Sequence, residues 1–328
     1  MVSTAAVWQV EQAEFTISQS DTPPIDIDSW RSVSIPDRWA NENRWEQGLT
    51  GWYRIQLDDT PPDYPIAIYL QRLSINAKVY LNNTFVGSGG SFEEPVARNM
   101  HRPLLYLLPT SAWSDNAPNY VYIKLRVYPD YAHLVALQIG EHARLHAAYE
   151  RQHFVQVTLS QVLFTVALLT ALFGLLFWLR VERKAQNLLF GLTATSWSIY
   201  CLNLFVRDIP FSAKTWWWMI HSNLEWAVVF LMLFARRLLN RSWGSVDYSL
   251  VVYATLASLV YATLEYEHIN FVSRRIHLLS IIAAVVLNIW LLTEFVKNRN
   301  RDALVLGLSL IGVVALGIND LIRHSAPV

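Results

Sequence analysis

FVQVTLSQVLFTVALLTALFGLLFWL, residues 154–179, is the stretch that decides the architecture of this chain. It contains no Asp, Glu, Lys or Arg over 26 residues. As an α-helix it would extend roughly 39 Å, more than the ~30 Å hydrocarbon core of a bilayer. A buried helix of a soluble protein rarely needs so long an uncharged run. The stretch therefore predicts a transmembrane helix, and the sequence changes character on either side of it.

After this helix, apolar segments follow one another to the end of the chain, which predicts an all-α transmembrane bundle over residues 154–328. Each segment is near the 17–25 residues that a span requires. The six expected spans cover about residues 154–179, 185–206, 215–235, 248–264, 276–296 and 303–322.

The charges of the short loops predict the orientation of the bundle. Lys and Arg are most frequent in the loops after the first, third and fifth spans. Cytoplasmic loops carry the Lys/Arg excess, so these three loops are expected in the cytoplasm. The region before the first span, residues 1–140, is then expected outside.

Residues 1–140 have the pattern of antiparallel strands rather than helices. In Tyr120–Tyr128 the residues Val121, Ile123, Leu125 and Val127 alternate with polar or aromatic ones. Gly51–Leu57 and Ala77–Leu81 alternate in the same way, as strands with one buried face do. Many such short runs with Pro- and Asn-rich connections predict a β-sandwich. Residues 141–153 contain no Gly or Pro and predict a helical linker into the first span.

Composition excludes several classes of function. Equal numbers of acidic and basic residues give a net charge of zero, so nothing favours nucleic acid as a partner. The single cysteine, Cys201, rules out an internal disulfide. No metal-ligand spacing is visible, and no cofactor is expected. The lipid bilayer is the expected partner, and a homodimer stays open.

Part of the β-rich region resembles a known domain. The segments IPDRW (Ile35–Trp39), GWYRIQL (Gly51–Leu57), Asn76–Pro95 and Asn119–Val127 follow one another as in the jelly-roll sugar-binding domain of family 2 glycoside hydrolases. Asn82-Asn83 stands where that family commonly has Asn-Gly. The resemblance implies a galactose-binding-like jelly roll over about 110 residues. It implies no activity, since this domain is not catalytic in those hydrolases.

Two groups of residues in this region are candidates for binding a ligand, plausibly a carbohydrate. Aromatic side chains can stack on sugar rings, although a jelly roll also needs large aromatics in its core. Glu93 and Glu94 are neighbours in a Gly/Ser-rich loop, where solvated acids are common. The aromatic candidates are Trp39, Trp45, Trp52 and, less prominently, Trp113.

The combination of an outside jelly roll and a helical bundle resembles the bacterial seven-transmembrane receptors with diverse intracellular signalling modules (7TMR-DISM type). VALGINDLI (Val314–Ile322) is similar to the Asn-Asp motif late in that family's sixth span, and the turn RVERKAQ followed by NLLFGL is similar to its opening. The resemblance implies a sensor in the bacterial inner membrane with a periplasmic N-terminal domain. It also implies a cytoplasmic effector such as a diguanylate cyclase or a histidine kinase, which residues 1–328 do not contain, so the chain is not expected to be an enzyme.

Polar residues in the outer half of the bundle are candidates for relaying a signal. His221 and Glu225 are four residues apart and share a helix face, and Glu225 lies near mid-membrane, where a bare charge is costly. Hydrogen bonding that merely holds helices together is an equally good interpretation. The remaining candidates are Arg274, Arg275, His277 and Asp320.

Two other functions stay open. A membrane-anchored carbohydrate-active enzyme would need two carboxylates facing each other across a sugar, and no such pair is evident. A small-solute transporter would show internal repeats and broken helices, and neither is evident in the sequence. The N-terminus lacks a signal sequence and six spans leave no cytoplasmic tail, so we also expect the full gene to encode an upstream apolar segment, a seventh span and an effector.

Overall fold

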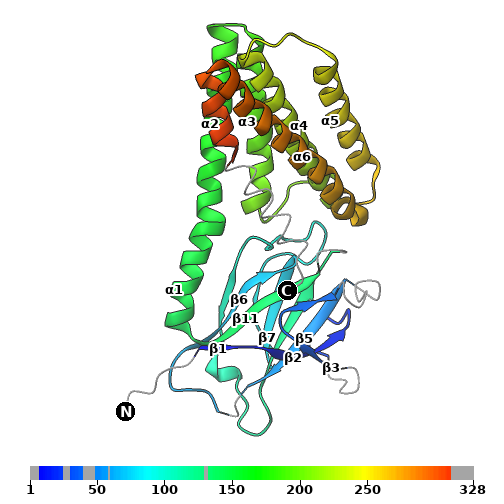
Figure 1. Cartoon of the computed structure of the whole chain (residues 1–328). Coiled ribbons are helices and arrows are strands. Elements are labelled where there is room, and N and C mark those ends of the chain that lie inside the picture. The colour runs from blue at the N-terminus through cyan, green and yellow to red at the C-terminus, as the bar shows by residue number, and fades with distance from the viewer. Residues whose placement is uncertain (1–6, 25–29, 40–48, 58–59, 129–131, 312–328) are drawn as a thin grey trace. The chain divides into compact units, whose positions relative to one another are not determined.

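The computed structural model describes residues 7–24, 30–39, 49–57, 60–128 and 132–311, with the side chains of residues 266, 267 and 270 excepted. The chain divides into two compact units (Figure 1). The first comprises Met1–Ser160 together with Leu204–Ala213, and the second Gln161–Asn203 together with Lys214–Val328. A short segment between two apolar helices therefore groups with the β-rich unit.

The first unit is a sandwich of two antiparallel sheets. One sheet has the order β1-β11-β6-β9, with β4 also paired to β11. The other has the order β3-β2-β5-β10-β7-β8. The strands of the first sheet are β1 (Val7–Gln9), β4 (Asp37–Arg38), β6 (Ile66–Leu73), β9 (Leu104–Leu107) and β11 (His133–Glu141). Those of the second are β2 (Gln12–Ile17), β3 (Arg31–Ser34), β5 (Thr50–Gln56), β7 (Asn76–Leu81), β8 (Thr84–Ser88) and β10 (Tyr120–Arg126).

Alternation along the central strands builds the core between the sheets. In β10 and just after it, Val121, Ile123, Leu125 and Val127 are fully buried, which confirms the predicted inward face. Strand β10 pairs with β5 on one side and β7 on the other, so these residues lie at the centre of the six-stranded sheet. The β-sandwich class expected from the sequence is confirmed.

Strand β11 passes directly into a long helix. Helix α1 (His142–His153) begins at the residue after β11 ends, and a π-helical turn (Phe154–Thr158) joins it to α2 (Leu159–Arg180). Together they form one helix, His142–Arg180. The apolar side chains of α2 are largely exposed, for example Leu169 at 61% and Phe173 at 67%. Exposed apolar surface of this kind is what contact with lipid requires.

The second unit is helical. It contains most of α2, and beyond it α3 (Ala185–Phe205), α4 (Ala213–Leu238), α5 (Ser245–Thr263) and α6 (Tyr266–Asn298), followed by a helical stretch over residues 301–311. Within the described residues, five helices are long and apolar enough to cross a membrane. This is compatible with a membrane protein. The rest of the expected sixth span lies outside the described residues.

The helices pack through small residues and small apolar clusters. A Cβ added at Gly191 would lie 2.8 Å from Leu175, so α3 approaches α2 closely at this point, as small residues permit in membrane bundles. Leu189 of α3, Val229 and Leu233 of α4 and Ala254 of α5 form one buried cluster.

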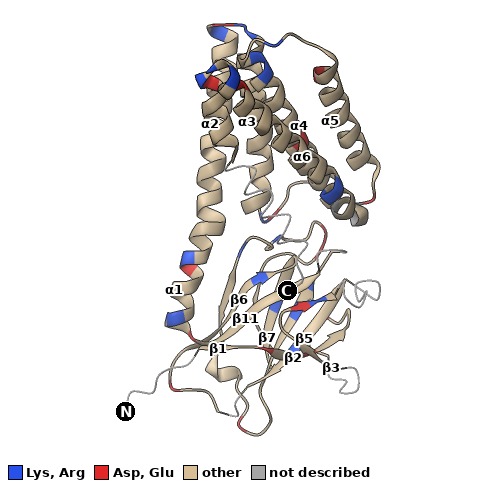
Figure 2. Cartoon of the chain, in the orientation of Figure 1, with Lys and Arg blue, Asp and Glu red and all other residues tan. Residues whose placement is uncertain are grey.

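The charges of the bundle lie mostly near helix ends (Figure 2). Arg180 is in the last turn of α2, Arg236 and Arg237 are in the last turn of α4, and Lys297 is in the last turn of α6. These three ends precede the loops that the sequence predicts to be cytoplasmic. That orientation remains a prediction.

Candidate functional site

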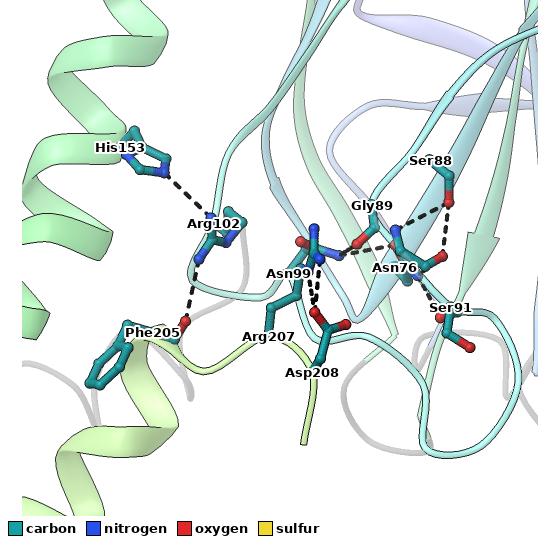
Figure 3. A network of polar contacts seen from close by, with 11 residues as sticks. Asn76, Ser88, Gly89, Ser91, Asn99, Arg102, His153, Phe205, Arg207 and Asp208 are labelled. Atoms are coloured by element: carbon teal, nitrogen blue, oxygen red, sulfur yellow. Dashed lines mark hydrogen bonds and ion pairs between the residues drawn. The ribbon is translucent and has the colours of Figure 1, made fainter. Parts of the chain in front are cut away.

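A pair of buried asparagines shapes the loop that follows β8 (Figure 3). Asn76 and Asn99 are fully buried, and the Asn99 Nδ2 donates to Asn76 Oδ1 at 3.0 Å and to the Gly89 carbonyl at 2.9 Å. Asn76 Nδ2 donates to the carbonyls of Gly90 and Ser91 at 3.2 and 2.9 Å. Buried amides with these bonds satisfied hold the loop backbone in one conformation.

This loop lies against the segment that joins α3 to α4. The backbone N–H of Arg98 donates to the Arg207 carbonyl at 3.0 Å. A Cβ built on Gly90 would lie 3.6 Å from Asp208 and 3.7 Å from Arg207. Arg207 and Asp208 themselves form an ion pair, in which Arg207 Nε and Nη2 both donate to Asp208 Oδ2, at 2.9 and 2.8 Å. The joining segment is thus ordered by contacts within the sandwich unit.

Arg102 ties the same segment to α1. Its Nη2 donates to the Phe205 carbonyl, the last residue of α3, at 3.3 Å, and its Nη1 lies 3.5 Å from His153 Nε2, the last residue of α1 (Figure 3). Burial, and secondarily the positive charge of Arg207, lower the pKa of Arg102. An arginine nevertheless stays charged near neutral pH, so one cation links two helix ends.

Helix α1 packs on the outer face of the five-stranded sheet. Leu145 is buried with Ala67 and Tyr69 of β6, and the Tyr69 hydroxyl donates to Gln152 Oε1 at 2.9 Å. Burial raises the pKa of Tyr69 to about 12, so this hydroxyl remains a donor near neutral pH. The sheet therefore holds α1 along much of its length.

The second unit contains a buried polar cluster centred on Glu225 of α4. The Glu225 side chain has no exposed surface. His277 Nδ1 of α6 lies 2.5 Å from Glu225 Oε1, and the hydroxyls of Tyr253 and Tyr261 of α5 lie 2.9 and 3.4 Å from its oxygens. Ser280 also donates to Glu225. One carboxylate thereby receives hydrogen bonds from two neighbouring helices.

A second imidazole extends this cluster, which we name the Glu225 cluster: His221, Glu225, Tyr253, Tyr261, His277 and Ser280. His221 Nδ1 lies 2.9 Å from His277 Nε2, and the Trp217 ring stacks on His221 with centroids 5.5 Å apart. Two imidazoles and a carboxylate are thus hydrogen-bonded in series. Of the predicted coupling residues, the structure brings His221, Glu225 and His277 together.

Arg274 and Arg275 do not belong to the Glu225 cluster. Both side chains are exposed, and the Arg275 guanidinium lies over the Phe271 ring at 3.6 Å. Helical geometry explains the difference, since Ser273, His277 and Ser280 share the buried face while residues 274 and 275 point elsewhere. Asp320, the remaining predicted coupling residue, lies outside the described residues.

Sequence reasoning missed Tyr253, Tyr261 and Ser280. Tyr253 and Tyr261 are eight residues apart, so they lie on one face of α5, and Ser280 is three residues after His277 on α6. Polar residues repeated along one face of an apolar helix were the available signal. It does not identify the residue on another helix that they contact.

The structure corrects part of the predicted ligand site. Trp39 and Trp52 have no exposed surface, so neither ring can stack on a sugar. Trp39 packs edge-on against Phe15 and donates to the Tyr53 hydroxyl at 2.8 Å, as a core residue. Trp52 is on the outer face of β5 and is covered by Tyr80 and Lys124.

The structure does not test the other predicted ligand residues. Glu93 and Glu94 are exposed neighbours, and the Tyr128 hydroxyl donates to Glu94 Oε1 at 3.5 Å. Their role stays a prediction. Trp45 lies outside the described residues.

Comparisons with known proteins found similarity to solved structures at low sequence identity. No known family matches the sequence, and no curated protein matches it. Among solved structures, a glycosyl hydrolase family 2 member from Bacteroides cellulosilyticus DSM 14838 is 15% identical, with a TM-score of 0.32, over 40% of this chain and 20% of that chain. Bacteroides uniformis β-glucuronidase is 18% identical, with a TM-score of 0.33, over 42% of this chain and 18% of that chain. Similarity at this level transfers neither an activity nor a ligand.

Proposed function

We propose that this chain is the sensory and transmembrane portion of a bacterial signal-transduction receptor. The sandwich unit binds an extracytoplasmic ligand, a carbohydrate, and the helical unit relays its presence to a cytoplasmic effector such as a diguanylate cyclase or a histidine kinase. The basic ends of α2, α4 and α6 face the cytoplasm in this proposal, as the excess of Lys and Arg favours.

The observation that carries the proposal is the grouping of Leu204–Ala213 with the sandwich. Arg98 N–H and the Arg102 guanidinium bond to the carbonyls of Arg207 and Phe205, between the end of α3 and the start of α4. A change in the loop that follows β8 would therefore act on the end of α3 and on the segment that leads into α4. A receptor needs contacts of this kind between its ligand-binding part and its helices. A ligand shifts the equilibrium between two conformations of a protein only when it interacts differently with each of them.

The Glu225 cluster supplies a candidate for the two-state element. It connects α4, α5 and α6 through one carboxylate, so a displacement of α4 must break or exchange some of these bonds. Charged groups within membrane helices commonly mark functional sites. Hydrogen bonds that only hold the bundle together remain the competing explanation.

Pulsed electron paramagnetic resonance on the full chain in nanodiscs tests the proposal. Spin labels at Trp243→Cys and Val296→Cys would report movement near the basic ends of α4 and α6, because both positions are exposed, with the buried native thiol Cys201 replaced by Ser. A saccharide identified by glycan-array binding should shift the label distance by about 1–2 Å, the scale of helix shifts in signalling. An unchanged distance at saturating ligand would contradict the receptor function.

Two variants then locate the coupling. Arg102→Ala removes the bond to Phe205 and should reduce the ligand-induced shift, whereas Arg144→Ala, an exposed arginine on the same helix as His153, should leave it unchanged. Glu225→Gln keeps the side-chain shape and removes the titratable charge. If Glu225→Gln responds to ligand with the same dose dependence as the unmodified chain, the cluster serves only to hold the helices together.

A further inference from the structure

The sandwich has a depression of about 810 Å³ whose walls come from both sheets and from their connecting loops. Its volume is within the usual range for small-molecule sites. Three aromatic residues line it: Trp8 of β1, Tyr64 of the loop before β6, and Trp113 of the loop between β9 and β10. We name this feature the Trp8 pocket.

Trp8 differs from the core tryptophans of the same unit, whereas Trp113 is half-buried and packs against the core. Trp8 is 45% exposed on an edge strand, whereas Trp39 and Trp52 are fully buried. A large indole that exposes nearly half of its surface in a depression offers a face on which a ligand can stack. Of the tryptophans that the sequence offered for stacking, Trp113 lines this depression, and Trp8 is an addition.

The segment that carries Trp113 is held in place by buried amides. Asn82 Nδ2 donates to the Ala112 carbonyl at 2.8 Å, and Asn119 accepts from Ser114 N–H at 2.8 Å and donates to the Ser114 carbonyl at 3.0 Å. Asn82 and Asn119 also bond to each other at 2.9 Å. Both neighbours of Trp113 are therefore fixed before a ligand arrives, which lowers the entropic cost of binding.

The chemistry of the lining selects a neutral ligand with hydroxyl groups. Gln56 and Thr60 supply an amide and a hydroxyl, and the described lining residues include no Asp, Glu, Lys, Arg or His. From these described residues a charged ligand would gain no ion pair to offset its lost hydration. A purely apolar ligand would leave the polar groups unpaired. Sugar rings present an apolar face for the aromatics and hydroxyls for the polar side chains.

The Trp8 pocket also adjoins the start of α1. Ile139 and Gly140, the residues just before the end of β11, line it. The carbonyl of Pro65, between the lining residues Tyr64 and Ile66, accepts from the N–H of His142, the first residue of α1, at 2.8 Å. A molecule in the pocket would therefore contact both segments that position the first turn of α1.

We infer that the Trp8 pocket is the site at which this chain binds a neutral saccharide, stacked on Trp8 and Trp113 and placed against the start of α1. This inference rests on the proposed receptor function and assigns its ligand site.

The test titrates the full chain in nanodiscs with neutral and acidic oligosaccharides by calorimetry. The neutral panel comprises gluco-, galacto-, manno- and xylo-oligosaccharides, and oligogalacturonate is the acidic probe. We expect a neutral saccharide to bind and Trp8→Ala and Trp113→Ala each to weaken it by about tenfold or more, the loss of one good contact. Phe85→Ala, an equally exposed aromatic residue on β8 outside the lining, should change the affinity less than about twofold.

A further variant, in an exposed loop, separates a loss of binding from a loss of folding. Thr60→Tyr fills part of the depression from an exposed position and should abolish binding without changing thermal unfolding. Equal affinity in all pocket variants would overturn the site while leaving the receptor function standing. Binding of only the acidic probe, or of no neutral saccharide, would overturn the ligand class. Pocket binding without a change in the Trp243–Val296 label distance would instead contradict the receptor function alone.

Discussion

Two acidic side chains of the sandwich, Glu14 and Asp21, are placed very differently from two of the helical unit, Glu225 and Asp247. In the sandwich, Glu14 pairs with Arg54 at 2.7 Å and Asp21 with Lys124 at 3.0 Å, and these carboxylates are 44% and 93% exposed. In the helical unit, Glu225 and Asp247 have no exposed surface and every carboxylate oxygen is bonded. Water can replace a lost partner in the first case but not in the second. An exposed, paired carboxylate such as Asp21 is therefore a minor contributor to stability, and a fully buried one such as Asp247 is a structural requirement.

The largest effect is expected from Asp247→Ala in the helical unit. Asp247 accepts from Arg236 at 2.8 and 3.1 Å, lies 3.0 Å from Arg237, and accepts from the Gly244 N–H at 2.9 Å. Its removal leaves two arginines without their carboxylate and should lower the free energy of unfolding by about 3–5 kcal/mol. Thermal unfolding in micelles would measure this. A midpoint equal to that of the unmodified chain would show that water solvates this end of α4.

Gly51→Ala should have the next largest effect, and it concerns packing in the sandwich rather than charge. A Cβ at this position would lie 2.6 Å from the rings of both Phe15 and Trp39, so the core must shift at a cost of about 1–3 kcal/mol. Faster hydrogen exchange of the β10 amides would detect this loss of stability. Gly244→Ala is the matched control, because a Cβ there meets nothing within 4 Å.

Glu14→Ala should cost less than about 1 kcal/mol, because this ion pair is partly exposed. Arg54 retains the faces of Trp30 and Tyr120, whose ring centroids lie 4.6 and 5.0 Å from its guanidinium carbon. Raising the salt concentration should reduce the effect of Glu14→Ala and leave that of Asp247→Ala largely unchanged. Similar salt dependence of the two variants would remove the contrast between the units.

The smallest effect should come from Asp21→Asn, and it should disappear in acid. The hydrogen bond from Lys124, and then its charge, lower the pKa of Asp21. The stabilising contribution is therefore present above the pKa of the unfolded chain, near pH 4, and is lost as pH falls through the lower value of the folded state. The stability difference between the unmodified chain and Asp21→Asn should be constant above about pH 5 and shrink toward pH 2. A stability difference that grows as the pH falls would contradict the predicted direction.

Sequence reasoning identified the architecture because the relevant patterns are local. The uncharged run over residues 154–179 requires a long apolar helix whatever surrounds it, and alternation in Tyr120–Tyr128 puts Val121 and its partners on one face. The Lys/Arg distribution marks helix ends in the same way. Each of these signals lies within one element and needs no knowledge of its neighbours.

The candidate sites depended on contacts between elements, which no single segment encodes. Trp52 shares a sheet face with polar residues, yet Lys124 of the adjacent strand β10 and Tyr80 of β7 beyond it cover its ring. Glu225 was recognisable as a costly charge in an apolar helix, but its partners on α5 and α6 follow only from helix packing. Trp8 and Trp113, over 100 residues apart in the sequence, line one depression because β1 and the loop before β10 meet there. Periodicity states which face of an element is buried, and only the packed structure decides what that face contacts.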